Sequence, residues 1–145
     1  MTQVDHVALV NGVILVVETK NYSGWIRGTA NQAQWTQSLA GGRVKIKFQN
    51  PLRQNHCHLK AVETVVGTAA DVVGIVVFVG AAEFPKGVPD GVVVGDGLTT
   101  FMKALQAKNG AETAKAWERL KMTVAVSDRS ELKKRHAQTI KAKVV

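Results

Sequence analysis

The chain has 145 residues, 46% of them hydrophobic and 21% charged, a composition typical of globular rather than disordered proteins. Nineteen lysines and arginines against eleven acidic residues give a net charge of +8, and a surface this basic attracts polyanions such as DNA or RNA. No apolar run reaches membrane-spanning length, the first residues lack a signal-peptide pattern, and one cysteine excludes an internal disulfide. We therefore expect a cytoplasmic protein with no membrane partner.

The first twenty residues predict a β-hairpin. Residues 3–10 and 13–20 are two nearly continuous apolar runs, and Asn11-Gly12 separates them. Asn-Gly is the strongest short-range hairpin signal, because a type I′ turn needs a positive φ at both central residues. Continuous apolar runs are typical of strands that are covered on both faces.

Two acidic residues in this hairpin form a candidate metal site. Asp5 and Glu18 are the only carboxylates in the first 62 residues. A two-residue turn makes paired residue numbers sum to 23, which places Asp5 opposite Glu18, and Lys20 follows on the same strand face. Two opposed carboxylates repel each other and need a cation, so the pair could hold a hard divalent metal. The alternative is a pair of ordinary surface acids at a solvated strand end.

The next segments predict more strands and a helix. We expect an extended stretch over residues 25–28 and an irregular or short-stranded region over 29–49, with basic side chains on one face of 44–48. Asn50 is a capping residue and Pro51 suits the first position of a helix. We expect this helix to run to about residue 67, with an apolar stripe made by Leu52, Leu59, Val62 and Val66.

The second half of the chain predicts short strands followed by helices. The expected strands are 72–80 and 91–94, and the expected helices are 98–108, 111–121 and 128–143, with a turn or short strand near 123–127. This order predicts an α/β fold with a mixed central β-sheet flanked by helices. We expect one domain over residues 1–145, with a helical and basic C-terminal part over 98–145.

Several sequence blocks in the first half have a recognisable order. They are Val4-Asp5-His6-Val7, Val17-Glu18-Thr19-Lys20-Asn21-Tyr22-Ser23-Gly24, Trp35, and Phe48-Gln49-Asn50-Pro51-Leu52-Arg53-Gln54-Asn55 with His58 following. Over about residues 3–80 the chain thereby resembles the nuclease-related domain, a branch of the PD-(D/E)xK or restriction-endonuclease-like superfamily. The resemblance implies a restriction-endonuclease-like core and a Mg²⁺- or Mn²⁺-dependent nuclease that acts on nucleic acid, with DNA the expected substrate. The resemblance is also compatible with a homodimer.

The resemblance also implies roles for individual residues. The catalytic residues would be Asp5, Glu18, Lys20 and Gln54, and the metal would be held by Asp5, Glu18 and the carbonyl of Thr19. Hydrolysis of a phosphodiester needs a cation that neutralises developing charge and activates water, and Lys20 would orient that water or stabilise the charge.

Basic and polar residues near this site are candidates for contact with nucleic acid. They are Arg27, Lys45, Lys47, Arg53 and His58. Gln54 and His58 are four residues apart and share a helix face. The alternatives are a solvated basic surface without a partner and, for His58, an ordinary surface histidine.

The start of the chain differs from the family pattern. Such domains usually begin with a helix that carries another acidic residue, whereas this sequence opens on a strand at Met1. We therefore expect the N-terminal helix to be missing, which keeps a catalytically degenerate nucleic-acid-binding or scaffold module as the alternative function. An unrelated α/β protein with a basic surface would instead have Asp5 and Glu18 pointing apart.

A zinc site is a weaker alternative. His56-Cys57-His58 could bind zinc with His6 as a fourth ligand. Adjacent helical residues point in different directions, however, and the spacings typical of zinc sites are absent.

Overall fold

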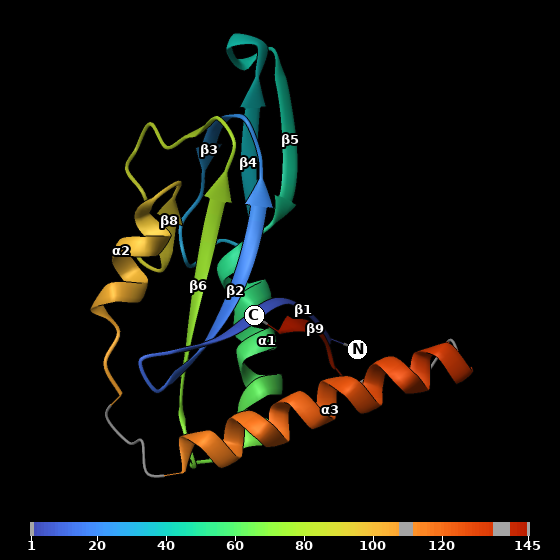
Figure 1. Cartoon of the computed structure of the whole chain (residues 1–145). Helices are drawn as coiled ribbons and strands as arrows, with labels where there is room; N and C mark the ends of the chain where they lie inside the picture. The colour runs from blue at the N-terminus through green and yellow to red at the C-terminus, as the bar shows by residue number, and fades with distance from the viewer. Residues whose placement is uncertain (1, 108–111, 135–139, 145) are drawn as a thin grey trace.

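The computed structural model describes residues 2–107, 112–134 and 140–144, with side chains described for 6–107 and 112–123. Its elements are β1 (Thr2–Val10), β2 (Val13–Asn21), β3 (Gly24–Arg27), β4 (Gln34–Leu39), a short 3₁₀ turn η1 (Ala40–Gly42), β5 (Val44–Gln49), α1 (Pro51–Val66), β6 (Asp71–Val79), β7 (Ala82–Glu83), β8 (Val92–Val94), α2 (Gly97–Ala104), α3 (Thr113–Lys134) and β9 (Ile140–Val144). They form a mixed α/β fold with a restriction-endonuclease-like arrangement, as the sequence predicts (Figure 1).

The first sheet has five strands in the order β8-β6-β2-β1-β9. Strands β1 and β2 are antiparallel, whereas the other three pairs are parallel. Asn11 and Gly12 have φ values of 51° and 78°, so both turn residues have the positive φ that the hairpin prediction requires. The described pairs run from Val10 opposite Val13 to His6 opposite Val17, which confirms the predicted register over that stretch.

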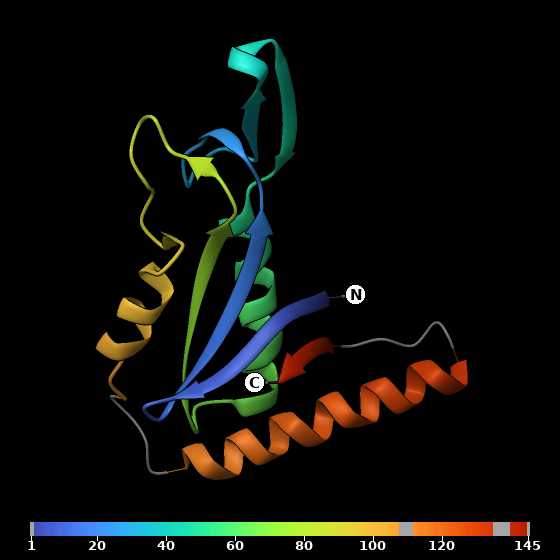
Figure 2. The same ribbon diagram turned by 45° about the horizontal axis from the view of Figure 1, so that its top comes forward.

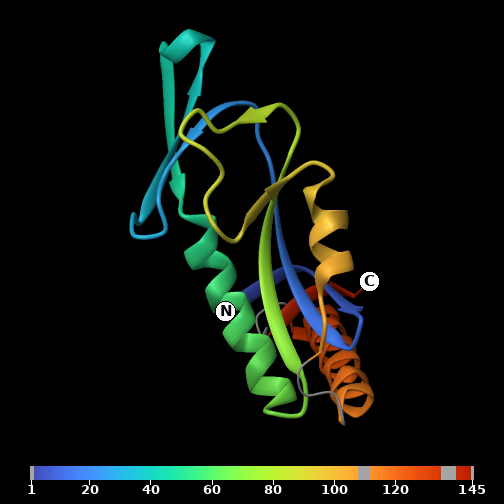
Figure 3. The ribbon, with the colours of Figure 1, turned by 90° about the vertical axis from the view of Figure 1, so that its left-hand side faces the viewer.

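Strand β2 is covered on both faces, which explains its unbroken apolar sequence. Val16 packs in a cluster with Val62 and Val66 of α1, whereas Leu15 and Val17 belong to a separate cluster that contacts α2. Figure 3 shows α1 and α2 on opposite sides of β2 and β6.

The region over residues 29–49 contains two short strands, which confirms the short-stranded alternative. Strands β4 and β5 form an antiparallel hairpin within a second sheet of order β5-β4-β3-β7, and this hairpin projects from the rest of the molecule (Figure 1). Several side chains of one cluster, among them Ile26 and Phe48, attach the second sheet to the first, and the largest of them is Trp35. Its fully buried ring is stacked on Phe78 of β6, with 6.3 Å between the ring centroids.

Helix α1 begins at Pro51, and Asn50 is its cap, as predicted. The Asn50 side chain accepts hydrogen bonds from the backbone N–H groups of Leu52 and Arg53. Its Nδ2 also lies within 2.8–3.3 Å of the carbonyl oxygens of Thr29, Ala30 and Gln32. One buried side chain therefore fixes both the start of α1 and the loop between β3 and β4.

The predicted C-terminal helix over 128–143 is wrong, and so is the break near 123–127. Helix α3 runs without interruption from Thr113 to Lys134, and residues 140–144 form β9, parallel to β1 (Figure 2). The sequence Ile-Lys-Ala-Lys-Val alternates apolar and basic residues with the period of a strand. The β-branched residues near 123 reduce helix propensity only slightly, which a long helix tolerates. No described helix is long and apolar enough to cross a membrane.

We predict that Asn50→Asp destabilises the fold at least as much as Asn50→Ala, although aspartate is as good a cap as asparagine. Aspartate would keep the cap but place an oxygen against three carbonyl oxygens. The free energy of unfolding of each variant, measured by urea unfolding monitored by circular dichroism, should be about 2–3 kcal/mol lower than that of the wild type. The exposed Gln49→Glu is the matched control, expected within about 0.5 kcal/mol of the wild type. A stable Asn50→Asp variant would contradict the donor role of Nδ2.

Candidate active site around Glu18

Glu18 is a buried carboxylate near the C-terminal end of β2. It is 2% exposed and pairs with Val76 of β6. It continues the alternation of Ile14 and Val16, whose side chains pack in the cluster that includes α1. A buried carboxylate is costly without partners, so its neighbours determine whether it stays charged.

Two potentially cationic groups contact the Glu18 carboxylate. Lys20 Nζ lies 3.2 Å from Oε1, and His58 Nδ1 lies 3.3 Å from Oε2. The second contact is not aligned as a hydrogen bond, and neither Oε2 nor Nδ1 has a hydrogen-bond partner among the described residues. Burial, the largest single influence, raises the pKa of Glu18, but the combined attraction of His58 and Lys20 outweighs it, so the pKa lies below the ordinary value. The carboxylate is therefore ionised at neutral pH.

Helix α1 is held close to β2 and β6, which places His58 beside Glu18. Asn55 Nδ2 lies 3.2 Å from the carbonyl oxygen of Val16 and 3.3 Å from that of Ile75. Gly74 makes this approach possible, because a Cβ there would lie 3.0 Å from Asn55 Nδ2. The amide thus joins α1 to both central strands one turn before His58.

The structure brings together two of the predicted catalytic residues and His58, which was predicted as a nucleic-acid contact. Glu18, Lys20 and His58 are in contact, and Gln54 lies one turn before His58 on α1, with its Oε1 buried and unpartnered among the described residues. Asp5 belongs to β1, but its side chain lies outside the described residues, and its pairing with Glu18 stays a prediction.

The predicted nucleic-acid contacts lie on different elements. Arg27 is on β3, and Lys45 and Lys47 are on β5; all three side chains are exposed on the second sheet. Arg53 Nη2 donates a hydrogen bond to the carbonyl of Asn31 at 2.7 Å. His58 is 6% exposed, so the alternative of an ordinary surface histidine is wrong.

The donor chemistry of the site suits a hard cation better than zinc. Glu18 Oε2 is a buried, ionised oxygen without a hydrogen bond to any described residue, and Mg²⁺ and Mn²⁺ prefer such ligands. Among the described side chains, no three or more His, Cys, Asp or Glu residues gather at one point. His56 and Cys57 are exposed while His58 faces Glu18, which separates the proposed zinc ligands.

Sequence reasoning missed the contact between His58 and Glu18, although a signal for it was present. The residues of α1 that are buried are Pro51, Asn55, His58, Val62 and Val66. Their spacing of three or four is that of one helix face. The stripe of Val62 and Val66 therefore continues through His58 and Asn55, and buried polar residues on such a stripe need partners.

Comparison with known proteins identifies the family of the chain. A family model described as the nuclease-related domain matches residues 1–79. An uncharacterized protein of Bacillus anthracis is 48% identical over 65 residues, a match that covers 45% of this chain and 30% of the relative. The chain thus matches less than a third of that curated relative. No solved structure matches the chain.

The lowered pKa of Glu18 predicts a specific pH dependence of stability. Its ionised form is favoured by folding, so its contribution is fully present above the ordinary value of 4.5 and is lost as the pH falls through the lower pKa of the folded state. Glu18→Gln should therefore lower the free energy of unfolding by roughly 2–3 kcal/mol at pH 7. This is less than the loss expected on breaking a fully buried ion pair, because Lys20 reaches solvent.

The difference in free energy of unfolding between the wild type and Glu18→Gln should shrink between pH 5 and pH 3. Urea unfolding of both proteins at each pH measures it. Glu112→Gln, which removes an exposed pair with Lys115, is the control and should change stability by less than about 1 kcal/mol. A difference between wild type and Glu18→Gln that grows on acidification would contradict the lowered pKa.

Proposed function

Because the chain belongs to the nuclease-related domain family, we propose that it is a metal-dependent nuclease that hydrolyses phosphodiester bonds of DNA. Family membership indicates a nuclease-related role and interaction with nucleic acid. The observation that carries the finer proposal is the buried, ionised Glu18, with Lys20 against one oxygen and a second oxygen that has no hydrogen bond among the described residues. This combination of carboxylate and amine suits phosphodiester hydrolysis.

In this proposal Lys20 is the residue that meets the phosphate. Its side chain is 17% exposed, whereas that of Glu18 is 3% exposed, so the amine lies between the buried carboxylate and solvent. From there its positive charge can stabilise the negative charge that develops on the phosphate oxygens, or it can orient the attacking water.

Glu18 and Asp5 would hold the metal ion, with the carbonyl of Thr19 as a further ligand. A bound Mg²⁺ or Mn²⁺ would supply charge neutralisation at the phosphate and lower the pKa of a water molecule. The register of the hairpin, continued by one pair beyond His6 opposite Val17, would place Asp5 opposite Glu18 as the second carboxylate. Gln54, near the start of α1, would contact the phosphate backbone or position Lys20.

His58 acts in this proposal by positioning Glu18 rather than by touching the substrate. Its ring lies 3.3 Å from Oε2 and is almost fully buried. Asn55 fixes the helix that carries it, so the ring restricts the rotamers available to the carboxylate. Replacing His58 should therefore weaken metal binding without removing a reacting group.

One observation favours the alternative, a nucleic-acid-binding or scaffold module with a degenerate site. Glu18 already has a close contact with Lys20 and another with His58, so its charge is balanced without a metal ion. A metal would have to compete with these neighbours for the carboxylate. In this alternative the three residues form a structural ion-pair cluster, and the protein binds nucleic acid without cleaving it.

We predict that the full chain cleaves DNA in the presence of Mg²⁺ or Mn²⁺ and that Lys20→Met lowers the rate by about 100-fold or more. Methionine keeps most of the length of the side chain and removes the amine, with its charge and its hydrogen-bond donors. The assay would follow single- and double-stranded labelled DNA, with RNA in parallel, across a series of divalent metals.

Lys103→Met on α2 is the matched control for the loss of one lysine, and it should cleave at the wild-type rate. Binding of uncleaved DNA by Lys20→Met should fall only a few-fold. If the wild type binds DNA but cleaves neither DNA nor RNA with any metal, the enzyme proposal fails and the binding module is favoured.

A further inference from the structure

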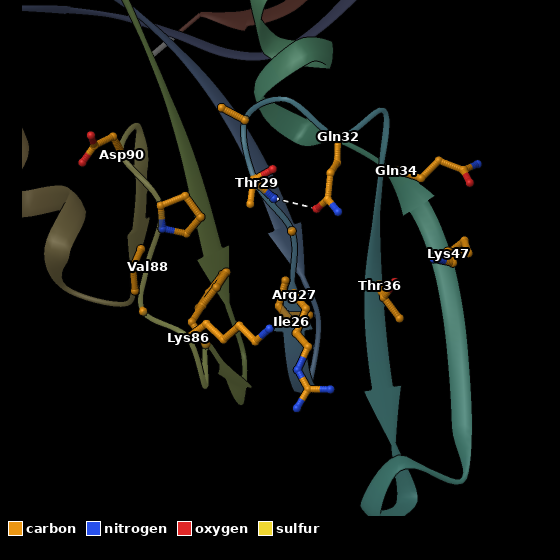
Figure 4. A pocket seen from close by; sticks show the side chains of 15 residues that line it. Ile26, Arg27, Thr29, Gln32, Gln34, Thr36, Lys47, Lys86, Val88 and Asp90 are labelled. Atoms are coloured by element: carbon orange, nitrogen blue, oxygen red, sulfur yellow. Dashed lines mark hydrogen bonds between the residues drawn. The ribbon is translucent and has the colours of Figure 1, made fainter.

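The second sheet carries a cavity that the Glu18 site does not use. Its volume is about 530 Å³, within the range of small-molecule sites. Its walls are β3 and the loop after it, the neighbouring parts of β4 and β5, and the loop over 84–90 (Figure 4). None of Glu18, Lys20, Gln54 and His58 lines it.

Three positively charged side chains line this cavity from three different segments. Arg27 comes from β3, Lys47 from β5 and Lys86 from the loop after β7. All three are exposed, and none forms an ion pair with a described acidic residue. Their charges are therefore available to an anion.

The pairing of the strands sets the spacing of two of these charges. Arg27 pairs with Thr36, and Thr36 pairs with Lys47, so the three side chains form one row across β3, β4 and β5. Arg27 and Lys47 are two strand spacings apart, about 10 Å at the backbone. A phosphate above the Thr36 hydroxyl would lie between the two cations and could accept a hydrogen bond from that hydroxyl. Figure 4 shows the Lys86 side chain extending toward β3 from the opposite wall.

The rest of the wall combines apolar side chains with the polar Thr29, Gln32 and Gln34 and one carboxylate. Phe84, Val88 and Pro89 supply the apolar surface, and Asp90 supplies the acid. A simple inorganic anion would gain nothing from the apolar surface and would be repelled by the acid. A sugar hydroxyl can donate to a carboxylate, and a nucleobase can pack on apolar side chains.

The loop that forms one side of the cavity is already fixed in position. Trp35 Nε1 donates to the carbonyl of Thr29 at 2.9 Å, and Asn50 Nδ2 lies 2.8 Å from that of Gln32. The Thr29 N–H in turn donates to Gln32 Oε1 at 2.9 Å (Figure 4). A ligand therefore need not order this wall, which lowers the entropic cost of binding.

We propose that this cavity binds a nucleoside phosphate, either free or as one nucleotide of a nucleic-acid strand. The phosphate lies at the row of Arg27, Thr36 and Lys47, the sugar faces Asp90, and the base packs on the apolar wall. The proposal does not depend on catalysis at Glu18, because the two sites share no residue.

The test measures binding of 5′-AMP to the full chain by isothermal titration calorimetry in EDTA, so that no metal-dependent reaction contributes. Adenosine and inorganic phosphate are the partial ligands, and each should bind at least about 10-fold more weakly than 5′-AMP. Lys47→Met and Lys86→Met should each weaken 5′-AMP binding by about 10-fold. Arg43→Met removes a cation from the same hairpin but outside the cavity, and it should change the affinity less than twofold.

A second arm separates the two sources of the ligand. If a short single-stranded oligonucleotide displaces 5′-AMP, the ligand is a nucleotide within a strand. If the oligonucleotide does not displace 5′-AMP, the ligand is a free nucleotide. Either outcome supports the proposed binding site. Several results would overturn the proposal: no 5′-AMP binding, equal affinity for adenosine or for phosphate, or equal weakening by Arg43→Met and Lys47→Met. The last would mean diffuse attraction to a basic surface. Unchanged melting temperatures would show that the variants fold.

Discussion

The contact of α1 with the two central strands determines where the chemical groups of this protein lie. Asn55 bridges the carbonyls of Val16 and Ile75, and Gly74 leaves the space for that bridge. Without this close approach, the ring of His58 would not reach Glu18, and the carboxylate would be buried with Lys20 alone. The chemistry of the candidate site thus depends on a backbone glycine and an amide that have no chemical role themselves.

The sequence predicted those parts of the fold that are determined by the conformational preferences of neighbouring residues. Asn11-Gly12 determined the turn and so the register of β1 and β2, and Asn50-Pro51 determined the start of α1. The same register placed Glu18 and Lys20 on one face of β2, where the structure has them in contact. These predictions succeeded because each depends on a few adjacent residues with strong conformational preferences.

The predictions that were incomplete or wrong depend on contacts between distant segments. The place of the hairpin of β4 and β5 in the molecule depends on the pairing of β4 with β3 and on the packing of Trp35 and Phe48 against Phe78 of β6. Residues 140–144 form a strand because β1 offers them a free edge, a partner that no local pattern reveals. His58 was assigned to a nucleic-acid surface because its partner lies forty residues away on another element.

The pairing of β9 with β1 has a consequence for the order in which the protein assembles. Strand β1 is synthesised before β9, its second neighbour in the sheet, and most of the other elements lie between the two in the sequence. Such a pairing raises the contact order and slows this step relative to the local hairpin. During synthesis β1 is a temporary edge strand, open to pairing with another nascent chain. The sheet around the strand that carries Asp5 is therefore complete only after β9 has been synthesised.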